Sequence, residues 1–170
     1  IGIDLGGTNT VFGIVDAQGT IVAQDSMKTQ AYETAEAFVE AGVARLVPLI
    51  SKVGGLDAIA GMGIGAPNAN FYTGAIETAP NITWAHERTV PLAKMFSEQL
   101  SSLDSRQKEP FPVRITNDAN AAAMGEMAYG AARGMKNFIV ITLGTGVGSG
   151  IVINGQLVYG HDGFAGELGH

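Results

Sequence analysis

Cysteine is absent from the 170 residues of this chain. Its absence excludes disulfide bonds and thiolate-based zinc sites within these residues, and it fits a protein of the reducing cytoplasm. Ten lysines and arginines stand against sixteen acidic residues, the net charge is −6, and no basic run exceeds two residues. This balance argues against nucleic acid and anionic membranes as partners. The chain also lacks an apolar run of about 18 residues and a signal-peptide pattern, so we expect a soluble protein.

Glycine, in contrast, is abundant. The 24 glycines make up about 14% of the chain, roughly twice the usual share. Apolar residues make up 46% and charged residues 15%, which is a globular composition of one domain or two small ones. There is no Gly-X-Y period and there are only six prolines, so collagen and low complexity are excluded. The glycines are therefore expected in tight turns, in close packing or beside a ligand.

Hydrophobic periodicity predicts an α/β protein, with hairpins and helices on a buried sheet. From 31 to 52, apolar residues such as Phe38, Val43, Leu46 and Ile50 recur at helical spacing. Two stretches, 66–83 and 101–112, read as loops. The other predicted elements are helices over 90–103 and 118–130, and strands over 1–5, 10–15, 20–27, 58–65, 113–116, 138–143 and 149–153.

Both ends of the sequence fall inside structured motifs. The chain opens on the strand-like Ile1-Gly2-Ile3 without an initiator methionine, and it stops at Gly169-His170 within a polar motif. This pattern indicates a piece of a longer chain.

The chain also contains an internal repeat. Residues 1–7 align without a gap on residues 139–145, and Gly13–Val15 align on Gly150–Val152 one residue out of register. The same glycine-tipped hairpin thus occurs twice, roughly 138 residues apart. Two such hairpins predict two related half-domains that face each other across a cleft.

Glycine hairpins of this kind suit phosphate binding, because their backbone N–H groups form an anion-binding concavity. The hydroxyls of Thr8 and Thr145 can donate to phosphate oxygens, and Asp4 can hold a magnesium ion through water. The alternative for each hairpin alone is a plain tight turn. A Walker A motif is excluded, because no lysine lies near either hairpin. The stretch 61–66 formally fits G-x-G-x-x-A, but no helix opens after it, so we interpret its glycines as strand packing and reject a dinucleotide site.

Three segments resemble a known family. DLGGTNTVFGIVD at 4–16 resembles the first phosphate motif of the superfamily of hexokinases, actin and heat-shock chaperones. LGTGVGSGIVINGQLVYGHDGFAGELGH at 143–170 resembles the signature of the ROK family (repressors, open reading frames, kinases), and NDANAAAMGE at 117–126 resembles the segment between them. The resemblance implies a ribonuclease H-like fold of the actin and hexokinase type, and a sugar kinase similar to bacterial ROK glucokinases.

The resemblance also implies an organisation and a set of ligands. Residues 1–116 would form an N-terminal lobe with the first phosphate hairpin, and residues 117–170 the beginning of a second lobe whose remainder is missing. ATP and Mg²⁺ would be bound, the full-length form would be a homo-oligomer such as a dimer, and the 170-residue piece alone would be inactive. The implied nucleotide-binding residues are Asp4, Gly6, Gly7, Thr8, Asn9, Gly144, Thr145 and Gly146.

Asp118 is the candidate catalytic residue. It follows a predicted strand and opens a predicted helix, which places its carboxylate at the edge of a cleft. In the family, the aspartate at this position is the general base that activates the sugar hydroxyl for in-line attack on the γ-phosphoryl group. The alternative is an aspartate that caps the helix or stands in its first turn, and the two roles are compatible.

The resemblance also implies the sugar contacts. Asn117, Asp118, Glu167 and His170 match them, and Asn68 lies in a loop that borders the sugar in relatives. Mixed donors and acceptors suit adjacent hydroxyls. The family histidine equivalent to His170 also binds a structural zinc with three cysteines from further along the chain. Since one histidine cannot complete a tetrahedral site, we expect no zinc in these 170 residues alone.

Several alternatives stay open. The chain could come from a ROK repressor that binds sugar and DNA, although the intact DLGGTNT and Asp118 favour a kinase. An actin-like or chaperone ATPase would have no use for the motif with Glu167. Within kinases, N-acetylhexosamine, fructose and allose compete with glucose as substrates. Trp84 lies in APNITW, which fits a loop pattern of the family, but packing in the core explains this residue equally well. The two remaining histidines, His86 and His161, are assigned to the surface.

Overall fold

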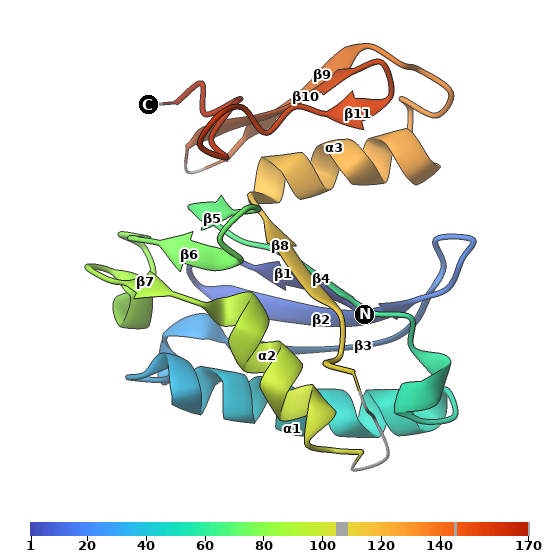
Figure 1. Cartoon of the computed structure of the whole chain (residues 1–170), viewed down its shortest axis with the longest axis vertical. Coiled ribbons are helices and arrows are strands. Elements are labelled where there is room, and N and C mark those ends of the chain that lie inside the picture. Colours follow the sequence, from blue (N-terminus) through green and yellow to red (C-terminus); the bar gives the residue numbers. More distant parts are fainter. Residues whose placement is uncertain (105–108, 145, 170) are drawn as a thin grey trace.

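The computed structural model describes residues 1–104, 109–144 and 146–169. A five-stranded sheet in the order β3-β2-β1-β4-β8 forms its centre (Figure 1). β1, β2 and β3 are antiparallel, whereas β4 runs parallel to both β1 and β8. The strands are β1 (Gly2–Leu5), β2 (Asn9–Val15), β3 (Ile21–Lys28), β4 (Met62–Gly65) and β8 (Val113–Thr116). The predicted first hairpin and third strand are thus confirmed.

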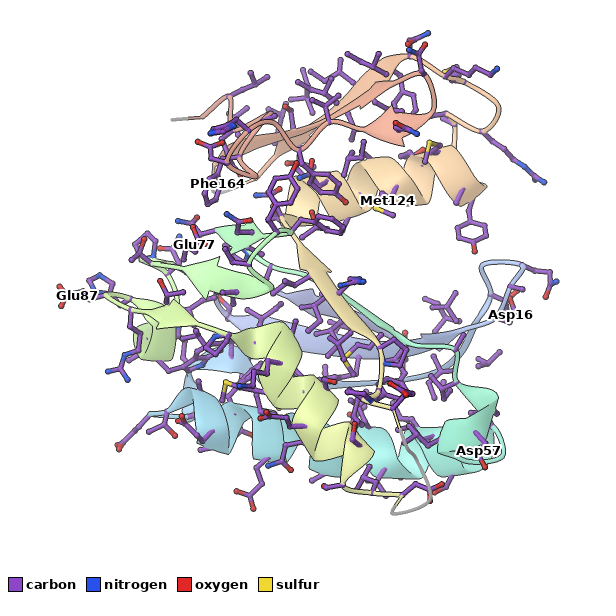
Figure 2. All side chains as sticks on the ribbon, viewed as in Figure 1. Asp16, Asp57, Glu77, Glu87, Met124 and Phe164 are labelled. Carbon is purple, nitrogen blue, oxygen red and sulfur yellow. The ribbon has the colours of Figure 1, made fainter. Side chains whose placement is uncertain are left out.

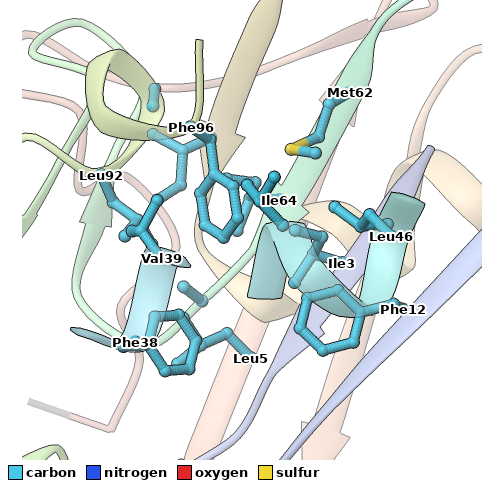
Figure 3. Close-up of a cluster of buried hydrophobic side chains, with 14 of the residues drawn as sticks. Ile3, Leu5, Phe12, Phe38, Val39, Leu46, Met62, Ile64, Leu92 and Phe96 are labelled. Carbon is cyan, nitrogen blue, oxygen red and sulfur yellow. The ribbon is translucent and has the colours of Figure 1, made fainter. Parts of the chain in front are cut away.

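Two helices cover one face of this sheet, namely α1 (Ala35–Lys52) and α2 (Leu92–Ser101) (Figure 1). Figure 3 shows the core between them and the sheet, where Phe12, Phe38 and Phe96 are fully buried. α1 begins later than the predicted residue 31, because Thr34 accepts a hydrogen bond from the N–H of Ala37 as the N-cap. Short 3₁₀ turns occur at Thr29–Ala31, Leu56–Ala58 and Thr83–Ala85.

The prediction of a loop over residues 66–83 is partly wrong. This stretch contributes two strands, β5 (Ala69–Asn70) and β6 (Ala75–Glu77), to a small sheet that β7 (Thr89–Val90) completes. Strands of two or three residues are too short to show an alternating pattern, so periodicity does not reveal them.

The last part of the chain forms a separate layer. α3 (Asp118–Tyr129) lies between the five-stranded sheet and a three-stranded antiparallel sheet (Figure 1). The latter is composed of β9 (Phe138–Leu143), β10 (Val147–Ile153) and β11 (Gln156–Leu157). The second hairpin is therefore confirmed, but β10 begins two residues before the predicted 149, so Gly148 belongs to a strand and not to the turn.

Small residues on α3 allow both sheets to approach it. A Cβ added at Gly65 of β4 would lie 3.0 Å from the Cβ of Ala121, and one at Gly150 of β10 would lie 2.5 Å from the Cβ of Ala123. The predicted close packing therefore holds for Gly65, against α3, and for Gly61, whose added Cβ would lie 3.1 Å from the carbonyl oxygen of Pro112, whereas a Cβ at Gly63 would meet no atom within 4 Å. β4 is a central strand of the sheet. Within the part of the chain that the structure describes, no helix is long and apolar enough to cross a bilayer.

Candidate functional site

A cavity of about 730 Å³ lies where the two glycine turns approach each other. The first turn contributes Gly6, Gly7 and Thr8, and the second contributes Gly144 and Gly146. The rest of its wall is formed by Gln30, Pro67, Asn68, Asn81, Asn117, Asp118, Thr142, Leu143, Val147, Gly148 and Glu167. Residues from opposite ends of the chain thus share one cavity, which agrees with the cleft that the internal repeat predicts.

Hydrogen bonds from Thr29, which does not line the cavity, hold the first turn by its carbonyl groups. The hydroxyl of Thr29 donates to the carbonyl of Gly6 (2.7 Å), and the N–H of Thr29 donates to that of Thr8 (3.0 Å). Among the described residues, no group accepts a hydrogen bond from the N–H of Gly7 or of Thr8. With the carbonyls engaged on one side, these two N–H groups are available to an anion in the cavity.

Gln30 is a site residue that the sequence did not reveal. Its Nε2 donates to the carbonyl of Gly7 (2.8 Å) and to that of Asn81 (2.5 Å). Its Oε1 accepts from the N–H of Thr83 (3.1 Å) and from the hydroxyl of the same residue. Gln30 therefore joins the first glycine turn to the loop around residue 81. The signal in the sequence is one polar residue after a strand, which by itself predicts no role.

The second turn is closed by a hydrogen bond from the N–H of Gly144 to the carbonyl of Gly146 (3.0 Å). Both glycines, which are predicted to bind nucleotide, line the cavity. Thr145, the predicted hydroxyl donor of this turn, lies outside the described residues, and so does His170.

Asn117 and Asp118 start α3 at the cavity wall. Asn117 is the N-cap, since its side-chain oxygen accepts from the N–H groups of Ala119 (2.7 Å) and Asn120 (3.4 Å). Its Nδ2 donates to Oε1 of Glu167 (2.7 Å), which brings together two predicted sugar contacts that lie 50 residues apart. Asp118 stands in the first turn, and its exposed carboxylate lines the cavity. The helix cap is thus provided by Asn117, which leaves Asp118 facing the cavity.

Asp4 is not among the residues that line this cavity. It lines a second, apolar groove of about 520 Å³ between the five-stranded sheet and α3. Burial and, next, the negative charge of Asp118 raise the pKa of the Asp4 carboxyl. Two carboxylates that repel each other near the glycine turns fit Mg²⁺, which takes one or two protein carboxylates and keeps several waters. Asn9, also predicted to bind nucleotide, begins β2 and is not among the residues that line the cavity.

Asn68 is also part of the cavity wall. It adopts a φ of +51°, and its Nδ2 donates to the carbonyl of Thr78 (3.1 Å) and, at 3.4 Å, to that of Glu77. Its amide nitrogen is therefore engaged with the backbone next to β6, which fixes the orientation of the side chain.

The remaining candidates lie away from the cavity. Trp84 is 1% exposed and packs on Phe38, with ring centroids 4.6 Å apart, so packing explains it. His86 and His161 are exposed, as predicted. Among the residues that the structure describes, no three histidines or acidic residues are grouped as a metal site. Acidic side chains such as Asp16, Asp57 and Glu87 instead lie at separate edges of the molecule (Figure 2).

The chemistry of the cavity follows from its wall. Backbone N–H groups and hydroxyls can bind an anion, and two carboxylates with several side-chain amides can bind a polyhydroxylated molecule. None of the described lining residues is a lysine or an arginine. Negative charge on a bound phosphate would therefore be balanced by N–H dipoles and by a cation that enters with it.

Comparison with known proteins agrees with this arrangement. The chain is 40% identical to a glucokinase of Streptomyces coelicolor over 171 residues, which cover all of this chain and 48% of that protein. It is 38% identical to the crystal structure of a ROK family glucokinase from Streptomyces griseus in complex with glucose and AMPPNP, with a TM-score of 0.78 over 99% of this chain and 49% of that one.

A xylose repressor of Caldicellulosiruptor bescii is 38% identical over 113 residues, which cover 66% of this chain and 25% of that protein. The chain spans about half the length of the glucokinases it matches. Its fold is that of the ROK sugar kinases, which share the architecture of actin and hexokinase. The model of the ROK family matches residues 1–170, and the chain belongs to the ROK family.

Proposed function

We propose that this chain carries the phosphate and acceptor sites of an ATP-dependent hexose kinase that converts glucose and ATP into glucose 6-phosphate and ADP. One observation carries the proposal: two glycine turns and the carboxylate of Asp118 line the same cavity. Phosphoryl transfer requires a phosphate cradle, charge balance and a group that takes the hydroxyl proton. The described residues can supply the first and the third.

In this proposal, the phosphates lie against the two turns. Gly6, Gly7 and Thr8 receive them on one side, and Gly144 and Gly146 on the other, with Thr145 as a further donor. Asn9 contributes from the start of β2. The N–H groups of the first turn are prepared for this role, because Thr29 and Gln30 already engage its carbonyls. Little reorganisation is then needed when an anion binds.

Asp4 would hold Mg²⁺ through water. The metal would supply charge balance for the phosphates, which the described wall of the cavity does not provide by itself. Burial and, next, the negative charge of Asp118 raise the pKa of the Asp4 carboxyl, and this neighbouring negative charge favours a cation there.

Asp118 would act as the general base. The N–H of Ala119 donates to its Oδ1 (2.8 Å), so Oδ2 is left to accept the proton of the sugar hydroxyl. Its place in the first turn of α3 puts the carboxylate at the positive end of the helix dipole. The hydroxyl oxygen would then attack the γ-phosphorus in line with the leaving ADP oxygen.

The sugar would be held by Asn68, Asn117, Glu167 and His170. Asn117 and Glu167 already share a hydrogen bond, so together they present oriented donors and acceptors to adjacent hydroxyls. The assignment of residues 1–116 and 117–170 to two lobes belongs to the same proposal. We propose glucose before other hexoses because two of the proteins named above are glucokinases, and the structure of one of them is a complex with glucose.

A sugar-binding repressor is the second candidate, since a xylose repressor also matches this chain. The test of both is a phosphorylation assay with the protein at its full natural length, ATP·Mg²⁺ and a panel of hexoses. Replacing Asp118 by Ala or Asn should lower kcat by about 10² to 10⁴-fold and leave the KM for glucose within a few-fold. Full turnover by the Asp118 variants would refute the assignment of Asp118 as the general base. Sugar binding by the wild type without turnover would favour the repressor.

A further inference from the structure

The turn between β5 and β6 contacts a segment about 90 residues further along the chain. We call this contact the junction, and it comprises residues 70–74 of the turn and residues 159–163 of the segment that follows β11. Figure 2 shows the two sides close together, with Glu77 on β6 and Phe164 at the end of the segment. None of the sequence motifs described above predicts this contact.

Asn70 forms the polar centre of the junction. It is 4% exposed, and its Nδ2 donates to the carbonyl of Asp162 (2.8 Å). Its Oδ1 accepts from the N–H groups of Tyr72 (2.9 Å) and Thr73 (3.4 Å) within its own turn. One side of the amide thus shapes the turn, and the other side binds the distant segment. A carboxylate cannot do both, because it has no hydrogen to donate.

Aromatic packing and close approach reinforce this contact. Phe71 and Tyr159 are stacked, with ring centroids 4.2 Å apart and 14° between their planes. The hydroxyl of Tyr72 donates to the carbonyl of Gly160 (2.9 Å). A Cβ at Gly163 would lie 2.6 Å from Oδ1 of Asn70, so the backbone of the segment approaches the amide as closely as glycine allows.

The segment leads directly to Glu167. The N–H of Ala165 donates to the carbonyl of Tyr159 (3.0 Å), and the hydroxyl of Ser149 donates to the carbonyl of Gly166 (2.6 Å). Glu167 then accepts from Asn117 at the cavity wall. Residues 159–167 are therefore anchored by hydrogen bonds at the junction, where Asn70 and Tyr72 donate, and further along by Ser149 and Asn117.

We infer that Asn70 is a positioning residue for sugar binding: through the carbonyl of Asp162 it holds the segment that places Glu167 beside Asp118. This inference rests on the proposed function, and it assigns Asn70 to the acceptor side of that site. The first glycine turn is held by Thr29 and Gln30, which belong to a different part of the structure. Loss of the junction should therefore weaken the binding of the sugar and leave the binding of the nucleotide unchanged.

Asn70→Asp is the decisive variant. Its carboxylate still accepts from Tyr72 and Thr73, but it cannot donate to Asp162 and faces that carbonyl with a negative charge. In the full-length protein we expect the KM for glucose to rise at least about 10-fold, because small displacements of positioning groups cost up to about 10²-fold. The KM for ATP should change less than about 2-fold, because the first glycine turn keeps its hydrogen bonds to Thr29 and Gln30 and is not displaced.

The matched control is Asn137→Asp, which adds the same charge at an exposed asparagine that only accepts a hydrogen bond, from Asn154. Gly163→Ala is the second variant, because it pushes the segment from Asn70 without adding charge. It should reproduce the rise in the KM for glucose. An unchanged KM for glucose in Asn70→Asp, or equal increases for glucose and ATP, would overturn the inference.

Amide hydrogen exchange provides a readout that does not require turnover. Peptides that cover 159–167 should exchange faster in Asn70→Asp than in the wild type and in Asn137→Asp, whereas peptides that cover 6–10 should not change. If the wild type phosphorylates no hexose, the proposed function fails, and exchange still decides whether Asn70 holds the segment. Unchanged exchange over 159–167 would refute that anchor.

Discussion

Replacing Gly65 by Ala should displace Asp118, the proposed general base. Gly65 ends β4, and its added Cβ would lie 3.0 Å from the Cβ of Ala121 and 3.7 Å from the Cα of Asp118. Carbon atoms prefer separations of about 3.5 to 4.0 Å. α3 would therefore have to move by about 0.5 to 1 Å, and its first residue would move with it.

The expected cost in stability is that of an overpacked core, about 1 to 3 kcal/mol. For a unit of this size, such a loss lowers Tm by about 2 to 12 °C. Activity should fall further than stability suggests, by up to about 10²-fold in kcat, because a displacement of about 1 Å is enough to misplace a catalytic group. Both quantities are measured on the full-length protein, by thermal unfolding and by steady-state phosphorylation of glucose.

Two further variants make this prediction refutable. Ala121→Gly in the Gly65→Ala background removes the clashing Cβ, so kcat should recover, while stability stays reduced by about 1 kcal/mol for a glycine within a helix. Gly125→Ala is the control on the same helix, since no atom lies within 4 Å of its added Cβ. It should leave activity unchanged. A Gly65→Ala protein with the wild-type Tm and kcat, or a double variant without recovery, would refute the reasoning.

Three other outcomes are expected. Gln30→Ala frees the carbonyl of Gly7, so the KM for ATP should rise about 10-fold in steady-state kinetics, whereas Gln24→Ala, an exposed control on β3, should leave it unchanged. Asp4→Asn should raise Tm at neutral pH: burial raises the pKa of this carboxyl, so its ionised form destabilises the fold. The advantage should shrink as the pH falls through the raised pKa of Asp4, and unfolding curves at several pH values check this. Trp84→Ala should cost about 3 to 5 kcal/mol in denaturant unfolding, because it removes a buried ring that packs on Phe38; a loss below about 1 kcal/mol would contradict this.

Much of the fold follows from local patterns. The stretch from Phe38 to Ile50 has the period of a helix, and β9 alternates strictly between half-buried and exposed residues. Such patterns predict long elements, because burial on one face imposes the same spacing everywhere in the element. They do not predict β5 and β6, which have two and three residues and are stabilised by their place in the small sheet.

The candidate site divides in a similar way. Gly6, Gly7, Gly144 and Asp118 stand in motifs whose order is visible in the sequence, and the structure brings all four to one cavity. Gln30 and Asn70 have no motif. Their roles depend on partners 51 and 92 residues away, and a side chain with no local partner shows no local pattern.

The amino-acid sequence thus specifies the parts that chemistry requires locally: glycines where backbone N–H groups must approach an anion, a carboxylate at the start of a helix, and apolar periods that bury each element. Tertiary structure decides which atoms of those parts are free to act. Packing turns the carbonyls of the first glycine turn toward Thr29 and Gln30, makes Asn117 the helix cap so that Asp118 faces the cavity, and connects the segment with Glu167 to the small sheet of β5, β6 and β7 through Asn70. These outcomes follow from hydrogen bonds between distant segments, which form only when the hydrophobic core has fixed the positions of the sheets and helices.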